Sequence, residues 1–243
     1  MFRHHGKNRT YAHNLKLASL LSFVAGLVNI TGVLAIKILT TNVTGHFAYF
    51  SEELFNGNYK IGILYLAFIL SFLIGSFVSN FLIEVGLRLK LNISFIIPMI
   101  IETLILILVA FGGEPSISPT LNTKILGGAL LFAMGLQNSL VTKVSQSVVR
   151  TTHLTGLFTD LGIELSQLFF YKKIEEYQKL KKNINLKLAI ITCFFLGCVM
   201  GGYLFKYLRL KTLLFAAACV IIALFYDTIR LYYYQMKRKS QVL

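Results

Sequence analysis

The sequence contains few cysteines and no recognisable catalytic motif. Its three cysteines, at 193, 198 and 219, all fall in apolar runs, where a thiol usually behaves as a small hydrophobe. No glycine-rich phosphate loop, Ser-His-Asp set or metalloprotease helix is present, and His46 and His153 alone give no metal set. We therefore expect no disulfide, no bound metal, no cofactor and no enzymatic activity.

Acidic residues are also scarce. Ten Asp and Glu residues against 24 Lys and Arg residues give a net charge of +14. The even basic stripe of a nucleic-acid-binding domain is missing, because the basic residues stand in tails and in connections between apolar runs. We expect no nucleic-acid partner, and we expect the Lys-rich segment 172–187 to touch anionic lipid at the cytoplasmic face of a bilayer.

Long apolar runs are what the sequence has in abundance. It is 56% hydrophobic with a mean hydropathy of +0.69, well above the values of a soluble domain. A bilayer crossing needs roughly 20 apolar residues, and six runs approach that length. They are 17–36, 61–83, 93–111 (interrupted by Glu102), 125–142, 188–205 and 210–226.

Basic residues orient these runs through the positive-inside bias. The N-terminal tail 1–16, the connection 166–187 and the C-terminal tail 233–243 are all basic. With six spans, both termini are expected in the cytoplasm. One basic group lies on the opposite side in this topology and counts against it: Lys206, Arg209 and Lys211.

A threonine motif occurs twice in the chain at an offset of 111 residues. Residues 40–45 and 151–156 both read Thr-Thr-x-x-Thr-Gly, and both lead to a Glu-Leu pair, at Glu53 and at Glu164. The segment 25–29 of the first run likewise resembles 134–138 of the fourth run. The second and fifth runs resemble each other loosely, around Gly75 and Gly201.

These matches divide the chain into two three-span repeats, 17–112 and 125–232, joined by the turn-rich linker 113–124. Three spans is an odd number, so the second copy must insert with the opposite orientation. The predicted fold is an all-α membrane protein with six transmembrane helices in two inverted repeats. Each repeat has a broken or half-helix at its threonine motif.

The motif itself is a poor helix interior, because threonine is β-branched and glycine adds flexibility. We expect a break, then a half-helix with a threonine as its N-cap. The free N–H groups and positive end of such a half-helix can hold a polar or anionic group. The motif is therefore either a tight corner between helices, a lining for a substrate, or, least favoured, part of a catalytic site.

If the motifs line a substrate site, polar groups on the first and fourth helices complete it. Asn138, Thr142, Ser145 and Gln146 share one helical face. Such groups can equally bond helices together. The predicted lining residues are Asn29, Thr41, Thr44, Gly45, Asn138, Thr152, Thr155 and Gly156.

Three carboxylates are candidates for proton or ion coupling: Glu102, Glu53 and Glu164. Glu102 stands in the middle of an apolar run, where a charge costs about 2.5–3.5 kcal/mol. It should be protonated or find a partner, such as Lys37, Lys143 or the polar face of the fourth helix. The alternatives are a buried structural hydrogen bond for Glu102 and solvated helix ends for the other two.

The segments 25–29, 44–45, 135–138 and 151–156 together resemble the YoaK-type family of bacterial multi-pass membrane proteins. The likeness covers roughly 17–232 and implies a fold and a place in the bacterial inner membrane. It implies no reaction, because that family has no known function. Two departures are Asn29, where the family typically has Asp, and His46, where it typically has Asn.

The sequence leaves two functions open. The first is a secondary transporter or facilitator of a small polar or anionic solute, with its site between the halves. The second is a membrane scaffold or accessory subunit that transports nothing and binds a partner through its basic cytoplasmic segment.

Overall fold

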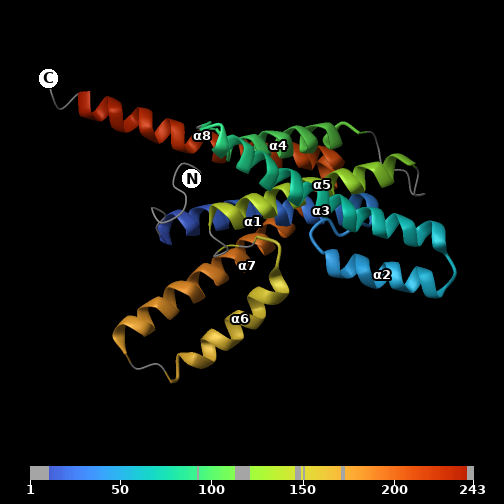
Figure 1. Cartoon of the computed structure of the whole chain (residues 1–243), viewed down its shortest axis with the longest axis horizontal. Helices are drawn as coiled ribbons and strands as arrows, with labels where there is room; N and C mark the ends of the chain where they lie inside the picture. Colours follow the sequence, from blue (N-terminus) through green and yellow to red (C-terminus); the bar gives the residue numbers. More distant parts are fainter. Residues whose placement is uncertain are drawn as a thin grey trace.

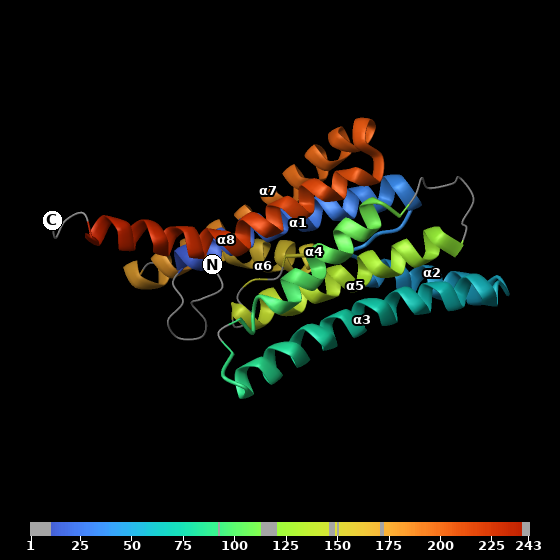
Figure 2. The same ribbon diagram turned by 90° about the horizontal axis from the view of Figure 1, so that it is seen from above.

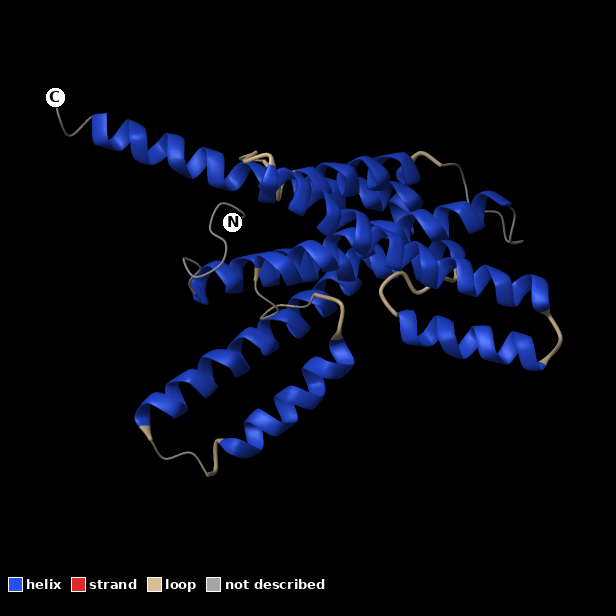
Figure 3. Cartoon of the chain, in the orientation of Figure 1, coloured by secondary structure: helices blue, strands red, loops and turns tan. Residues whose placement is uncertain are grey.

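The computed structural model describes residues 11–91, 93–112, 121–145, 149, 151–170 and 173–239, and this part of the chain is helical with short connections (Figures 1 and 3). Residues 1–10 and 240–243 of the basic tails, most of the linker 113–124 and Gln146 lie outside it. The helices are α1 (Tyr11–Ile36), α2 (Val43–Phe55), α3 (Tyr59–Arg88), α4 (Ile97–Ala110), α5 (Leu121–Val144), α6 (Leu154–Gln167), α7 (Ile174–Leu208) and α8 (Thr212–Lys239).

Four helical segments of the described chain are long and apolar enough to cross a membrane. They are Tyr11–Ile36, Tyr59–Arg88, Asn122–Val144 and Ile174–Phe225. The last segment contains both α7 and α8, which are joined by the short 3₁₀ helix η2 (Arg209–Lys211). At this turn Arg209 has a positive φ of 52°, and the chain reverses direction into α8, which packs against α4 and α1 (Figure 2).

Two predicted boundaries differ from the structure. The run 93–111 yields only the 14 helical residues of α4, about 21 Å long, because the helix starts at Ile97, next to Pro98, which favours the first turn of a helix. The connection 166–187 is not a separate surface segment, since α7 begins at Ile174 and continues without a break into the predicted span.

Two pairs of helices cross in close contact at glycines. A Cβ on Gly26 of α1 would overlap the carbonyl oxygen of Phe194 in α7, and a Cβ on Gly197 of α7 would overlap that of Phe23 in α1. Near the end of the same pair, Gly202 lies beside Leu34, so α1 and α7 run in the same direction. Small residues let backbones approach this closely.

The crossing of α3 and α5 is built in the same way. Gly75 faces the carbonyl oxygen of Phe132, and Gly135 faces that of Phe72. The Ser76 hydroxyl donates to the Gly135 carbonyl at 3.2 Å, just as the Cys198 thiol donates to the Gly26 carbonyl at 3.3 Å in the other crossing.

Gly75 and Gly197 therefore both serve the close packing of helices. These contacts match Gly75 with Gly197, at an offset of 122, so the sequence pairing of Gly75 with Gly201 was wrong. It was wrong because a lone glycine in an apolar run does not show which residues of the two runs correspond. The contacts at each crossing do show this.

The core lies where α1, α4, α5, α7 and α8 meet, with Leu21, Leu27 and Met134 fully buried. By contrast, large apolar side chains on the outward faces of α3 and α7 are exposed, among them Phe77 at 66% and Tyr203 at 65%. Exposed apolar surface of this extent on long helices fits a lipid environment.

Candidate solute cavity

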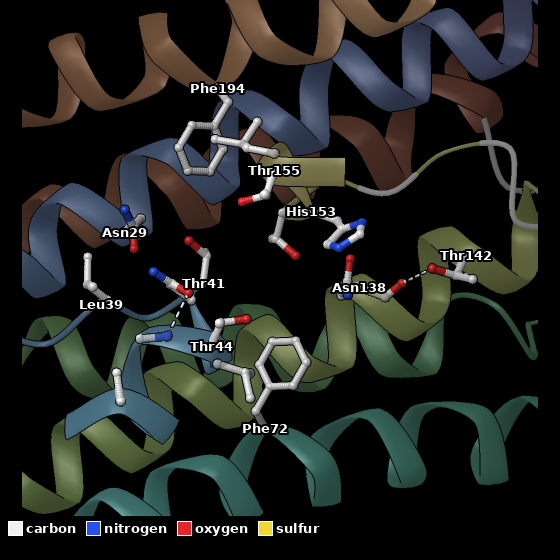
Figure 4. Close-up of a pocket in the computed structure, with 16 residues that line it drawn as sticks. Asn29, Leu39, Thr41, Thr44, Phe72, Asn138, Thr142, His153, Thr155 and Phe194 are labelled. Carbon is white, nitrogen blue, oxygen red and sulfur yellow. Dashed lines mark hydrogen bonds between the residues drawn. The ribbon is translucent and has the colours of Figure 1, made fainter. Parts of the chain in front are cut away.

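A cavity of about 930 Å³ lies where the two threonine motifs meet (Figure 4). The two motifs stand 111 residues apart in the chain. Its lining consists of Asn29, Leu39, Thr41, Asn42, Val43, Thr44, Gly45, Ala48, Phe72, Asn138, Thr142, Thr152, His153, Leu154, Thr155 and Phe194.

The break expected at the first motif is present. Helix α1 ends at Ile36, Lys37 turns the chain with a positive φ of 58°, and the chain is non-helical until α2 begins at Val43. The side-chain oxygen of Asn29 holds this segment in place by accepting a hydrogen bond from the backbone N–H of Thr40 at 3.1 Å. The polar residue of α1 therefore shapes the cavity wall as well as lining it.

The N-terminus of α2 is capped by Asn42. Its side-chain oxygen accepts from the N–H of Gly45 at 3.0 Å. The predicted threonine cap was wrong, because the amide of Asn42 already reaches the third residue of the helix. Thr44 is consequently left exposed and lines the cavity.

His46 anchors the start of α2 against the chain before it. Its ring is 1% exposed, its Nε2 lies 2.7 Å from the carbonyl oxygen of Leu39, and its ring packs near Tyr65 and Phe68 of α3. Burial lowers the pKa of His46, although the hydrogen bond to Leu39 opposes this. The ring is therefore neutral at pH 7 and donates from Nε2.

The second motif is held differently. Gln137 of α5 donates through Nε2 to the carbonyl of Leu21 at 2.9 Å and to the Thr151 hydroxyl at 3.3 Å. His153 stands where the first motif has Asn42, but its side chain makes no cap hydrogen bond to α6. Asn138 has a buried side-chain oxygen without a hydrogen-bond partner in the described structure.

Seven of the eight residues predicted to line a site meet at this cavity. They are Asn29, Thr41, Thr44, Gly45, Asn138, Thr152 and Thr155. Gly156 is not among the lining residues, because it lies directly beneath the ring of His153, where a Cβ would overlap the imidazole. That these residues bind a solute stays a prediction.

The polar face predicted on α5 is divided between two uses. Asn138 and Thr142 line the cavity, and the Thr142 hydroxyl also bonds the Asn138 carbonyl at 2.7 Å. Ser145 is buried and instead receives the N–H of Val149 at 3.0 Å. Ser145 therefore fixes the chain after α5 rather than lining a pathway.

Sequence reasoning missed the two aromatic rings of the cavity, Phe72 and Phe194. Each stands three residues before a crossing glycine, Gly75 or Gly197. A Phe-x-x-Gly pattern in the second and fifth apolar runs is the signal that could have located them. It was hidden because both runs are rich in phenylalanine.

The three candidate carboxylates lie away from the lining of the cavity. Glu164 forms an ion pair with Lys187, and Glu53 accepts a hydrogen bond from Asn58 at 2.8 Å. Glu102 is fully buried, and neither of its oxygens has a hydrogen-bond partner in the described structure. Lys143, one of its expected partners, pairs with Glu84 instead.

Residues 17–226 match the family model described as "Protein of unknown function (DUF1275)". No curated protein and no solved structure matches the chain.

Proposed function

This chain belongs to the DUF1275 family, whose description names no activity, and we propose that it is a membrane transporter or facilitator of a small polar or anionic solute. The observation that carries this proposal is the meeting of both threonine motifs at one cavity. Two half-helices, α2 and α6, begin there, and half-helix N-termini bring N–H groups and positive dipole ends to a solute. The protein has no enzymatic role in this proposal.

The helix directions support six spans in two inverted repeats. Helices α3 and α5 run in the same direction, since Gly127 lies near Phe68 and Gly135 near Ser76. The chain can achieve this only if α4 crosses back between them, despite its 14 residues. The first helix of each half, α1 or α5, then points the opposite way from its counterpart.

The third helix of each half supports the same plan. The buried positions of α4 recur in α8 at an offset of 114, so that Glu102 corresponds to Ala216 and Leu106 to Val220. The two glycine crossings, the two threonine motifs and the two cavity rings then each have a counterpart in the other half. A pseudo-two-fold axis in the membrane plane accounts for all of these matches.

In this topology the α6–α7 turn lies on the same side as both termini. That turn is followed by Lys173, just before α7, and by four lysines in the first half of α7: Lys179, Lys181, Lys182 and Lys187. We assign this side to the cytoplasm of a bacterial inner membrane and expect it to touch anionic lipid, at about 1 kcal/mol per basic residue near the surface. The basic group at 206–211 lies opposite and remains the exception.

Glu102 is the favoured residue for coupling transport to protons. Of the three candidates it alone lacks a partner, and an unpaired carboxylate in an apolar core is stable only when protonated. Ala216, the counterpart of Glu102 in the second half, has no ionisable side chain. The single carboxyl group of Glu102 therefore serves both halves.

Flux through purified protein in liposomes tests the proposal. Thr44→Val and Thr155→Val each remove a hydroxyl from the cavity while keeping the shape of the side chain, and each should lower solute entry at least tenfold. Thr159→Val is the matched control, since Thr159 lies on α6 outside the lining and its hydroxyl donates to the Thr155 carbonyl. Equal flux in all three variants would remove the threonines from the mechanism.

A scaffold that transports nothing is the second candidate. The observation that favours it is the α6–α7 turn, where Phe169 and Phe170 are 83% and 80% exposed beside the lysines. This function predicts that Thr44→Ala and Thr155→Ala leave activity in cells unchanged. It further predicts that replacing both phenylalanines with serine releases a copurifying partner.

A further inference from the structure

We infer that the cavity selects an uncharged ring-shaped solute, with apolar faces and a hydrogen-bonding edge, held between Phe72 and Phe194. This inference rests on the proposed function and narrows it to one class of solute. Sugars and nucleobases share this chemistry.

The cavity lining contains no Asp, Glu, Lys or Arg among the described residues. His153 is its single ionisable side chain. An ion that entered would lose part of its hydration water without meeting an opposite full charge, which is costly. A neutral solute avoids this cost, and its hydroxyl or carbonyl oxygens can still accept from the N–H groups at the starts of α2 and α6.

The two rings come from matching places in the two halves. The carbonyl groups of Phe72 and Phe194 are pressed against Gly135 and Gly26 at the two glycine crossings. The backbone of each phenylalanine is thereby part of one of the tightest contacts in the fold. Figure 4 shows the two rings on opposite walls, with polar side chains in the zone between them.

The polar zone offers neutral hydrogen-bonding groups. Thr44 and Thr155 bring hydroxyls that can donate or accept. Asn29 uses its oxygen on Thr40, whereas the Asn138 oxygen is buried and has no hydrogen-bond partner in the described structure. Amides and hydroxyls between two aromatic walls suit the polar edge and apolar faces of a sugar or a base better than a linear ion.

The volume is consistent with this class. A cavity of about 930 Å³ falls within the range of roughly 300–1,000 Å³ typical of small-molecule sites. It is large enough for one ring together with ordered water, which commonly completes such hydrogen bonding.

Entry of four radiolabelled probes into liposomes containing the full chain tests the inference. The probes are D-glucose, uracil, glycerol and inorganic phosphate. D-glucose or uracil should enter faster than in protein-free liposomes. Whichever of the two enters faster shows whether the solute is a sugar or a nucleobase. Glycerol and phosphate should enter at the protein-free rate.

Ring-face variants then identify the site. Phe72→Leu and Phe194→Leu keep an apolar side chain but remove the flat aromatic face. Each should lower the entry rate of the transported probe roughly tenfold, which is the effect of losing one stacking contact. Phe72→Tyr keeps the face and should retain most of the rate. Phe77→Leu, on the exposed side of the same helix, should change nothing.

The outcomes separate this inference from the proposed function. Phosphate or glycerol entry that depends on Thr44 and Thr155, without entry of either ring, overturns the inference and leaves transport standing. No entry of any probe overturns both. Should the leucine variants unfold, the same decision rests on wild-type protein, in which D-glucose or uracil, but not phosphate, must raise the thermal unfolding midpoint.

Discussion

Lys187 of α7 and Glu164 of α6 form an ion pair whose Nζ and Oε1 atoms lie 2.6 Å apart, with side chains only 15% and 13% exposed. In the proposed inverted repeat, Glu164 corresponds to Glu53 at the motif offset of 111, and Lys187 corresponds to Tyr65 at the crossing offset of 122. The second half-helix is thus fixed to its neighbour by charge, whereas the first is fixed by aromatic packing around His46 and Tyr65.

Removing one partner of this pair should loosen α6. We expect Lys187→Met to lower the free energy of unfolding by about 1–3 kcal/mol, because Glu164 would remain poorly solvated. The measurement is thermal unfolding followed by a dye that reacts with the cysteines as they become exposed. The control is Lys143→Met, which breaks an ion pair with 43% exposed partners and should cost less than about 1 kcal/mol. Similar losses from both variants would contradict a special role for the Lys187 pair.

The glycine crossings should tolerate no side chain. Gly26→Ala and Gly135→Ala place a Cβ against a backbone carbonyl, so we expect each to destabilise the fold by about 1–3 kcal/mol or to prevent folding. Gly162→Ala is the matched control, since nothing lies within 4 Å of the added carbon and alanine favours a helix. Dye-reported unfolding midpoints compare the three, and an unchanged midpoint for Gly26→Ala would refute the close crossing.

Glu102 should behave as a neutral acid in a core without partners. Glu102→Met should raise the free energy of unfolding by about 1–3 kcal/mol, because it removes an unsatisfied buried polar group of similar size. Infrared difference spectra should show a protonated carboxyl stretch in the wild type that Glu102→Gln abolishes. In a proton-coupled transporter, Glu102→Gln should also abolish the acceleration of flux by a pH gradient. A gradient response that survives this substitution would assign coupling elsewhere.

Two tips, the α2–α3 turn and the α6–α7 turn, should react with a thiol reagent from opposite sides of the membrane. Phe55 at the first tip is 92% exposed and Phe169 at the second is 83% exposed. In a chain freed of its three cysteines, Phe55→Cys should react with an impermeant thiol reagent added to intact cells, and Phe169→Cys only after lysis. Labelling of both from outside would exclude inverted repeats.

Much of this architecture could be predicted from the sequence, because the relevant forces are local or periodic. Apolar runs long enough to cross a bilayer predicted α1, α3 and α5 well. The duplicated threonines predicted a break before α2, since β-branched residues next to glycine disfavour a continuous helix. The predicted N-cap of α2 was wrong because an amide oxygen and a hydroxyl oxygen compete for the same backbone N–H group. Only the geometry of the folded chain decides which of them reaches it.

What the sequence alone determined is therefore the helical periods, the duplicated motif and the places where the chain breaks. The tertiary structure decided which duplicated elements meet: α1 packs on α7 and α3 on α5, so each half completes the cavity of the other. It also placed Phe72 and Phe194 on that cavity and left Glu102 without a partner. Contacts across more than 100 residues depend on the packing of whole helices at their small residues, and no local pattern encodes that register.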